Sequence, residues 1–405
     1  MTLHRILRLG HLGDGIAEGP VYVPRTLPGE GVEGELDGDV LTGVRIVEPS
    51  ANRIAPRCAH ARTCGGCQLQ HASDNFVQTW KQDTVAQALQ AQGLQPEFRP
   101  QDVSPPNTRR RATFAARRTR SGAMVGFHTR QSDTIVEVTS CDVLDPSLLA
   151  VIPAVRDLAK LGASRKHSIS VQVTTTAGGV DMSVQDAKPL SPDTVPQVGT
   201  LAEAYGLSRI TWNDDVLVQR APSEVDLGPA RVPLPAGAFL QATAQGQAAL
   251  TRDVLDILRP AQRVADLFAG CGTFALPLAQ TAEVLAVEAE ARMLDALQQG
   301  WRHAAGLKDV QTQTRDLFRD PLQASELTRF DGIALDPPRA GAQAQVATLA
   351  EAKVPRVAYV SCNPQSFARD ARCLVDAGYR LDWVRVVDQF RWSTHIELVG
   401  AFVIA

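Results

Sequence analysis

Residues 264–274 read VADLFAGCGTF, an apolar run that reaches an acid and continues into a glycine-rich loop. The run predicts a buried strand that ends at Asp266, and Gly270 and Gly272 would let the backbone approach a ligand closely before a helix begins. The next apolar run, EVLAVEA, ends at Glu288, where a carboxylate can bind two ribose hydroxyls. The stretch therefore predicts a strand, loop and helix that bind a nucleotide.

The glycine loop distinguishes two classes of nucleotide-binding enzyme. The third glycine of a dinucleotide fingerprint does not follow Gly272, and a shorter loop with a spaced acid is typical of S-adenosylmethionine methyltransferases. We therefore favour a methyltransferase over a dehydrogenase. A further acid, Asp316 in QTRDLF, follows the next predicted strand and could reach an adenine amine, although an ordinary helix N-cap explains it nearly as well.

The rest of the chain divides into three predicted regions. From residue 231 to 405 apolar runs alternate with helical stretches, which predicts an α/β fold with a doubly wound, mostly parallel, Rossmann-like sheet. Residues 1–57 alternate short strand-like runs with Gly, Pro and Asp turns, a pattern that predicts a small β-barrel. Residues 58–230 read as an α+β central region that contains an amphipathic helix over 74–91.

Composition and charge indicate in which cellular compartment the protein works and which partners it can bind. No segment approaches the ~18 consecutive apolar residues of a membrane span, and the N-terminus lacks the apolar stretch of a signal peptide, so we expect a soluble cytoplasmic protein with no membrane partner. The net charge is −3, yet residues 99–130 contain eight arginines against a single acid. Such a stretch suits contacts with phosphates, although a lone charge run is more often a solvated hairpin.

Four of the seven cysteines form a candidate metal site. Thiols are kept reduced in the cytosol, which favours metal binding or catalysis over disulfides. Four thiolates make either a tetrahedral zinc site or an iron–sulfur cluster, and the pair spaced by two residues does not choose between them. The candidate ligands are Cys58, Cys64, Cys67 and Cys141.

Cys362 is a separate candidate, for catalysis. It follows the apolar run Val357 to Val360 in YVSCNP, and the motif DPPRAG (336–341) ends another predicted strand nearby. A thiol at the end of a buried strand, beside an acid, suits a nucleophile. A free cysteine is more often a small buried hydrophobe, but the neighbouring motifs favour the catalytic interpretation.

Taken in order, these motifs resemble the RNA (uracil-5-)-methyltransferase family, most closely its iron–sulfur branch that acts on 23S ribosomal RNA. The likeness covers nearly the whole chain. It includes a TRAM-like barrel with VYVPRTLPGEGVEG, the cysteine spacing x5-x2 with a distant fourth cysteine, FLQA, DLFAGCGTF, DPPRAG, VSCNPQSFARD and STHIE. The resemblance implies S-adenosyl-L-methionine and a [4Fe–4S] cluster as cofactors, the four cysteines as cluster ligands, RNA and not DNA as partner, and a monomer.

The resemblance also implies residue roles. Cys362 would add to C6 of a uracil, Glu397 would remove the C5 proton after methyl transfer, and Asp336 would line the joint pocket of base and cofactor. The target base would have to leave its stack. The implied cofactor positions are Gln241, Phe268, Gly270, Gly272, Thr273, Glu288, Asp316 and Asp336.

The chain departs from the family pattern at two places that bear on substrate choice and, neutrally, at Ala269 and Cys271 of the glycine loop, and three other functions compete. Thr243 stands where an Asn is common, and Arg391 and Trp392 stand where a Pro is expected, which bears on substrate choice. A transfer RNA uracil-5 methyltransferase generally lacks the cluster cysteines, and a cytosine-5 methyltransferase usually has its nucleophile after Pro-Cys. A catalytically silent RNA-binding factor would not need both Cys362 and Glu397.

Overall fold

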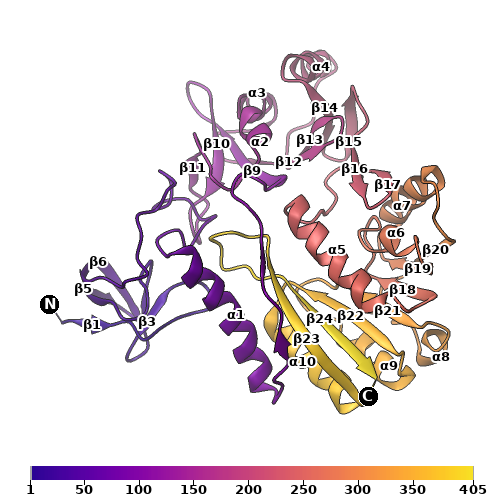
Figure 1. Cartoon of the computed structure of the whole chain (residues 1–405). Helices are drawn as coiled ribbons and strands as arrows, with labels where there is room; N and C mark the ends of the chain where they lie inside the picture. Colours follow the sequence, from indigo (N-terminus) through magenta and orange to yellow (C-terminus); the bar gives the residue numbers. More distant parts are fainter. Residues whose placement is uncertain (1, 405) are drawn as a thin grey trace.

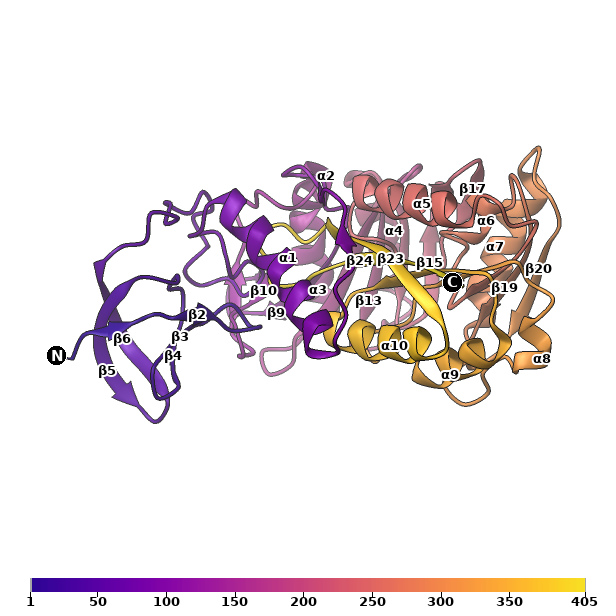
Figure 2. The ribbon, with the colours of Figure 1, turned by 60° about the horizontal axis from the view of Figure 1, so that its bottom comes forward.

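The computed structural model describes residues 2–404, and its three regions are visible in Figure 1. The N-terminal strands form a six-stranded sheet in the order β1-β5-β6-β4-β3-β2, around a small core that includes Val23, Val32 and Leu41. This sheet lies at one end of the elongated molecule (Figure 2). Its strands are β1 (His4–Arg5), β2 (Arg8–Leu9), β3 (Gly15–Ala17), β4 (Val21–Val23), β5 (Gly31–Asp37) and β6 (Val40–Glu48).

The middle region is built on a seven-stranded sheet in the order β11-β10-β9-β12-β13-β14-β15. The apolar stretch around residues 146–162 forms two helices and not one, because Pro153 has no backbone N–H and suits the first turn of a new helix. The elements are β9 (Arg111–Arg118), β10 (Ala123–His128), β11 (Ile135–Glu137), α2 (Pro146–Ala150), α3 (Ile152–Gly162), β12 (Ile169–Thr176), β13 (Gly179–Gln185), α4 (Val195–Ala204), β14 (Leu207–Trp212) and β15 (Asp215–Gln219).

The C-terminal region contains the doubly wound sheet predicted from the sequence. Five neighbouring strands run parallel in the order β20-β19-β18-β21-β22. Beyond β22 the nine-stranded sheet continues with β24, which is antiparallel to β22, and then with β23, which is antiparallel to β24. The strands are β16 (Glu224–Leu227), β17 (Ala230–Pro233), β18 (Arg263–Leu267), β19 (Glu283–Glu288), β20 (Val310–Thr314), β21 (Gly332–Leu335), β22 (Arg356–Ser361), β23 (Tyr379–Asp388) and β24 (Leu398–Ile404), of which β16 and β17 form a separate hairpin.

Helices cover both faces of this sheet, with an apolar core on each side. They are α5 (Ala244–Leu258), α6 (Ala275–Leu278), α7 (Ala291–His303), α8 (Ala324–Leu327), α9 (Gln343–Ala352) and α10 (Pro364–Asp376). Within residues 2–404, no helix combines the length and apolar character that a membrane crossing requires.

One segment from the expected central region joins this sheet. The predicted amphipathic helix is present as α1 (Asp74–Ala91), which begins where Ser73 Oγ accepts the N–H of Phe76. It packs against α10, and the short strands that follow it, β7 (Glu97–Phe98) and β8 (Asp102–Val103), pair with β23 (Figures 1 and 2). The chain that leaves the cysteine loop, which we define as residues 58–72, is therefore anchored on the C-terminal sheet.

Candidate active site

The residues proposed for cofactor and substrate follow the carboxyl ends of neighbouring parallel strands. In an open α/β sheet this edge is where ligands bind, because the loops there diverge and leave a crevice. The candidate residues and the strands that they follow or end are Phe268, Gly270, Gly272 and Thr273 (β18), Glu288 (β19), Asp316 (β20), Asp336 (β21) and Cys362 (β22).

The glycine loop after β18 adopts backbone conformations that favour glycine. Gly270 and Gly272 both have positive φ, at 54° and 96°. A Cβ on Gly272 would lie 2.8 Å from Leu297 Cγ, so a larger residue has no room there. Glu288 Oε2 accepts the N–H of Gly270 at 3.0 Å, which ties the loop to the end of β19. The carboxylate that was expected to bind ribose hydroxyls therefore also holds the loop.

An aromatic pair lies beside this loop. The rings of Phe268 and Phe318 have their centroids 5.3 Å apart, and Phe318 is 47% exposed. Asp316 Oδ1 accepts the N–H of Phe318 at 3.0 Å, so the acid fixes the turn that presents the ring. Sequence reasoning selected Asp316 and missed Phe318. An apolar ring two residues beyond a candidate adenine-binding acid was the available signal.

The pairing of β22 with β24 brings Cys362 and Glu397 to the same edge of the sheet. Ser361 pairs with Leu398 in this antiparallel ladder, and each candidate is the next residue outward from that pair. Glu397 is 4% exposed, whereas Cys362 is partly accessible. The structure therefore assembles the thiol and the carboxyl group that lie far apart in the sequence.

Two glutamines connect the two acids. Gln241 Nε2 donates to Asp336 Oδ2 at 3.3 Å, and Gln389 Nε2 donates to both Gln241 Oε1 at 2.6 Å and Glu397 Oε2 at 3.0 Å. The N–H of Ala242 donates to Gln389 Oε1 at 2.8 Å. Gln389 was not predicted from the sequence. Its position just after a strand and before the H-x-E motif was the only signal.

Burial and negative charge set the protonation of the site. The pKa of Glu397 is raised, first by burial and then by the charge of Asp336, whose own pKa is also raised by burial. Burial, followed by the charges of Glu397 and Asp336, raises the pKa of Cys362 to about 11. The resting site therefore favours a neutral thiol and a protonated carboxyl group.

The motifs DPPRAG and SCNP are joined through one backbone carbonyl. Asn363 Nδ2 donates to Arg339 O at 2.9 Å, and Ser366 Oγ donates to the same oxygen at 3.2 Å. The positive charge of Arg339 lowers the pKa of Cys362 against the larger effects of burial and the acids. Arg339 was not selected from the sequence, although it lies within a motif that was.

The segment that precedes Glu397, which we call the reaction loop (residues 388–396), is held by the first half of α1. Lys81 Nζ donates to Asp388 Oδ1 at 2.7 Å, and both side chains are buried. Asp74 accepts from Arg391 Nη2 at 2.5 Å and from Trp392 Nε1 at 2.9 Å. The two residues that replace the expected proline therefore dock the reaction loop on α1.

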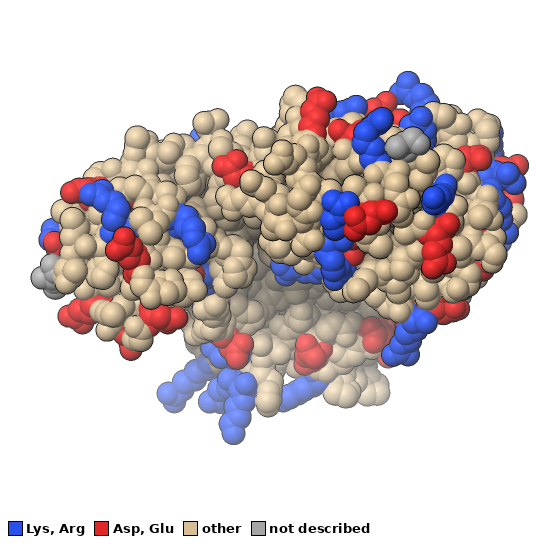
Figure 3. Space-filling view, turned by 90° about the horizontal axis from the view of Figure 1, so that it is seen from below, with Lys and Arg blue, Asp and Glu red and all other residues tan. Residues whose placement is uncertain are grey.

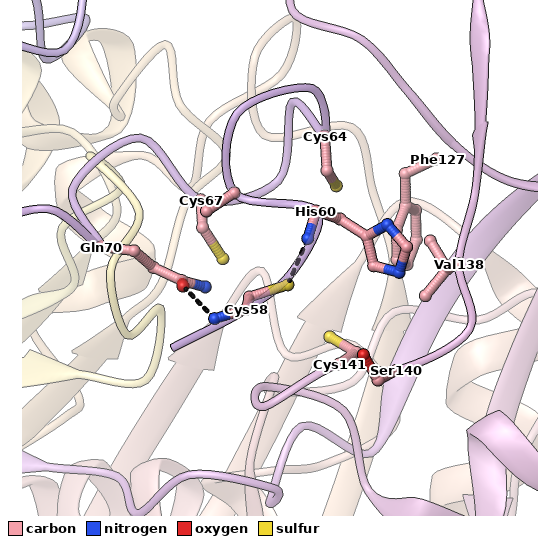
Figure 4. Close-up of a pocket in the computed structure, with 10 residues that line it drawn as sticks. Cys58, His60, Cys64, Cys67, Gln70, Phe127, Val138, Ser140 and Cys141 are labelled. Carbon is pink, nitrogen blue, oxygen red and sulfur yellow. Dashed lines mark hydrogen bonds between the residues drawn. The ribbon is translucent and has the colours of Figure 1, made fainter. Parts of the chain in front are cut away.

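The four candidate metal ligands line one cavity (Figure 4). Their thiols point toward a common space, and burial, followed by the charges of neighbouring thiolates, raises the pKa of Cys67 to about 12. In the part of the chain that the structure describes, no group of three or more His, Cys, Asp or Glu side chains is arranged to hold a single metal ion. The cysteines are Cys58, Cys64, Cys67 and Cys141.

The arginine-rich stretch does not form one exposed surface. Arg110 donates to Gln241 O at 3.1 Å and to Gln247 Oε1 at 2.6 Å, and is therefore part of the support of the site. Arg118 and Arg120, in contrast, are exposed at the hairpin between β9 and β10. In Figure 3 several basic side chains gather on the more distant, fainter part of the molecule.

Comparisons with known proteins identify the family. Residues 230–404 match the model of the tRNA (uracil-5-)-methyltransferase family. A Mesorhizobium japonicum protein described only as an RNA methyltransferase is 41% identical over 98% of this chain and 96% of its own. The 23S rRNA (uracil(1939)-C(5))-methyltransferase RlmD of Shewanella piezotolerans is 31% identical over 98% of this chain and 94% of its own. The chain belongs to the RNA (uracil-5-)-methyltransferase family. The predicted family and the prediction of an RNA methyltransferase are thereby confirmed.

A solved structure of the family shares the fold. It is the tRNA (uracil-54, C5)-methyltransferase of Pyrococcus abyssi in complex with S-adenosyl-L-homocysteine, with a TM-score of 0.78, 21% identity and 99% coverage of both chains. The expected Rossmann-like methyltransferase fold is confirmed by this likeness. The TRAM-like character of the N-terminal sheet and the iron–sulfur cluster stay predictions.

Proposed function

We propose that this enzyme methylates C5 of a uridine in RNA through a covalent bond between Cys362 and C6 of the uracil. The observation that carries the proposal is the placement of Cys362 beside Glu397, with Asp336 joined to Glu397 through two glutamines. A nucleophile and a separate base at one sheet edge are what addition at C6 and proton removal at C5 require.

The order of proton transfers follows from the chemistry of the base. Uracil C5 is a weak nucleophile. Once the Cys362 thiol has lost its proton to solvent, the thiolate can add to C6 and place the displaced electron pair on C5, which can then take a methyl group from a sulfonium as the C–S bond breaks and a neutral thioether leaves. Because the C5 proton must leave before the thiolate can be expelled, Glu397 has to be ionised at that step. Gln389 donates to Glu397 and favours its charged form, so this hydrogen bond opposes the effect of burial.

The site fits S-adenosylmethionine, which would supply an electrophilic methyl group on its sulfonium. Both carboxylate oxygens of Asp266 are buried without a hydrogen-bond partner, and the pKa of Asp266 is raised well above its usual range by burial and then by Asp336. A cationic ligand with hydrogen-bond donors would compensate this group. Phe268 and Phe318 offer apolar surface for an adenine, and Glu288 and Asp316 offer acceptors at the ends of β19 and β20.

Within RNA, we assign 23S ribosomal RNA as the substrate. The relative with this activity in its name aligns over 94% of its length, and this chain has four cysteines around one cavity. Those cysteines suit a [4Fe–4S] cluster better than one zinc ion, because each ligand of a cluster binds a different iron of the cube, whereas all four ligands of a zinc site must meet at one ion. The cluster would fasten the cysteine loop to the middle region, and the N-terminal sheet would act as a TRAM-like RNA-binding barrel.

The experiment that tests the substrate is a map of 5-methyluridine in RNA from cells that lack this protein. We expect one position in 23S ribosomal RNA to lose its methyl group in digests analysed by mass spectrometry. The wild-type gene should restore it, and a gene encoding Cys362→Ala should not. Loss of 5-methyluridine from transfer RNA alone would overturn the ribosomal assignment and leave the reaction intact. Unchanged methylation in both RNAs would overturn the function.

A further inference from the structure

The turn between β2 and β3 of the N-terminal sheet (residues 10–14) contacts the reaction loop. Gly13 in this turn is buried, and a Cβ on it would lie 2.9 Å from Thr394 Cγ2 and 3.2 Å from Gln68 Cβ. Thr394 belongs to the reaction loop and precedes Glu397 by three residues, and Gln68 belongs to the cysteine loop. The reaction loop extends from the C-terminal sheet toward the N-terminal part of the chain (Figure 1). The β2–β3 turn, the cysteine loop and the reaction loop therefore meet at one point.

The β2–β3 turn is fastened both internally and to its surroundings. The N–H of Gly10 donates to Asp14 O at 2.7 Å, and the N–H of Gly13 donates to Gly10 O at 2.9 Å. The Asp14 carboxylate accepts two hydrogen bonds from Arg130, at 2.5 Å and 2.7 Å, which join the turn to the middle region. An apolar core shared by the N-terminal sheet, the cysteine loop and α1 begins at the residue before the turn. Its buried members are Leu9, Leu27, Leu69, Ala72 and Val77.

Gly13 occupies a position that no larger residue fits. Its φ is 84°, in the left-handed region that favours glycine. A carbon at 2.9 Å from the Thr394 methyl group would be well inside the ~3.5–4.0 Å at which carbon atoms pack. That methyl group is attached to a β-branched carbon whose rotation is restricted, and Gln68 Cβ is attached directly to the backbone. A side chain at position 13 would therefore displace the backbone of the reaction loop or of the turn.

The path from this contact to Glu397 is short. The N–H of Thr394 donates to Gln68 Oε1 at 3.4 Å, so the cysteine loop holds the same residue. Thr394 and Glu397 have their Cα atoms within about 11 Å, and Ile396 between them is 3% exposed in an apolar core. A close-packed core has few voids that could absorb a shift. A displacement at Thr394 would therefore move the Glu397 carboxyl group relative to Gln389, its hydrogen-bond partner at 3.0 Å.

We propose that the β2–β3 turn is a positioning element for methyl transfer: through Thr394 it holds the reaction loop so that Glu397 can reach the C5 proton. Gly13 is the positioning residue, because the turn approaches this closely only without a Cβ. The step that depends on it is release of the methylated RNA, since Cys362 follows β22 and lies outside the reaction loop. The role of Glu397 in this inference rests on the proposed function.

The experiment compares Gly13→Ala with Gly38→Ala. Gly38 also has a positive φ, 62°, in the N-terminal sheet, but it is exposed and a Cβ on it would meet nothing within 4 Å. Both variants therefore carry backbone strain, and only Gly13→Ala carries the clash. In single-turnover reactions we expect Gly13→Ala to release methylated RNA about 5- to 100-fold more slowly, the effect of a misplacement of up to about 1 Å, with adduct formation and RNA affinity unchanged. Gly38→Ala should release RNA at the wild-type rate.

A compensating variant and a spectroscopic measurement test the contact itself. Thr394→Ser removes Cγ2, the atom nearest to the added Cβ, so Gly13→Ala with Thr394→Ser should recover much of the lost release rate. Without RNA, ¹⁹F NMR of full-length protein labelled with 5-fluorotryptophan reports on Trp392, whose signal Trp392→Phe identifies. That signal should shift in Gly13→Ala, return toward wild type in the double variant, and stay unchanged in Gly38→Ala.

The outcomes separate this proposal from the proposed function. An unshifted Trp392 signal in Gly13→Ala would overturn the contact, and this measurement needs neither RNA nor turnover. Wild-type release by Gly13→Ala, an equal loss of release and RNA affinity, or a loss that Thr394→Ser does not reduce would overturn the positioning role. Asp14→Ala is a second variant, which frees the turn from Arg130 without a clash: it should slow release up to about fivefold, and wild-type release would count against the proposal. A wild-type protein that forms no adduct with RNA would overturn the proposed function instead.

Discussion

Cys362 and Glu397 are neighbours because Ser361 and Leu398 face each other across the β22–β24 ladder. The thiol leaves one strand at the sheet edge, and the carboxyl group arrives at the next strand at the same edge. The register of the ladder fixes these side-chain positions, because a slip by one residue would turn every side chain of the slipped strand to the other face of the sheet. The two chemical steps assigned to these residues can therefore be separated by substitution without disturbing the fold.

Glu397→Gln should trap the enzyme on its RNA. If Glu397 only removes the C5 proton, the thiolate still adds and the methyl group still transfers, but the adduct is not released. A covalent protein–RNA species should accumulate on denaturing gels when cofactor and RNA are present. The double variant with Cys362→Ala should give none, and Cys362→Ala alone should lose at least about a thousandfold in activity. Normal turnover by Glu397→Gln would show that another group is the base.

The reactivity of the Cys362 thiol should rise with pH. Its pKa of about 11 means that the thiolate fraction, and with it the rate of iodoacetamide alkylation, grows about tenfold per pH unit below that value. Glu397→Gln and Asp336→Asn each remove a negative charge that raises this pKa, so both variants should be alkylated faster than wild type at pH 8. The measurement is peptide mass spectrometry, with Cys373 as an internal control whose rate should not change. Equal Cys362 rates in all three proteins would contradict the assigned coupling.

The sequence predicted the strand-end residues well and the contacts between them poorly. Glycines, acids and the thiol that end parallel strands share one sheet edge by topology, so DLFAGCGTF, DPPRAG and YVSCNP were sufficient to place them. Gln389 and Arg339 were missed, because their roles depend on which side chains meet after folding. The arginine-rich stretch was interpreted as a basic patch for phosphates, but Arg110, which precedes β9, donates to Gln241 and Gln247 in the support of the site, whereas Arg118, at the far end of β9, is exposed.

Gln389→Leu should slow the step that requires an ionised Glu397. A hydrogen bond to a charged group contributes ~1.5–3 kcal/mol, so we expect a loss of about 10- to 100-fold in the rate of adduct release. The pKa of Glu397 should rise further, because this hydrogen bond lowers it, and the pH at which release becomes half-maximal should rise too. Single-turnover release measured from pH 6 to 10 checks this. A uniform loss at every pH would indicate a packing defect instead.

RNA affinity should depend on the exposed arginines of the β9–β10 hairpin and not on Arg110. Arg118→Glu with Arg120→Glu should weaken binding to all RNAs and lower the slope of log affinity against log salt by about one to two, because phosphate contacts release counterions. Arg110→Met is the matched control, since its partners are Gln241 and Gln247: it should lower activity and leave the salt slope unchanged. An unchanged slope in the double variant would make the hairpin an ordinary solvated surface.

Substitution of a cluster cysteine should remove the metal and also loosen the contact between the cysteine loop and the reaction loop. Protein purified without oxygen should be brown, with about four irons and four sulfides per chain. Cys58→Ser should lose the colour and lower the melting temperature, whereas Cys373→Ser, outside the cavity, should do neither.

The N–H of Leu69 donates to Trp392 O, so a loosened cysteine loop should also free the reaction loop, and the ¹⁹F signal of 5-fluorotryptophan at Trp392 should sharpen in Cys58→Ser. Stoichiometric zinc without sulfide would overturn the cluster, and an unchanged Trp392 signal in metal-free protein would show that the two loops are not coupled.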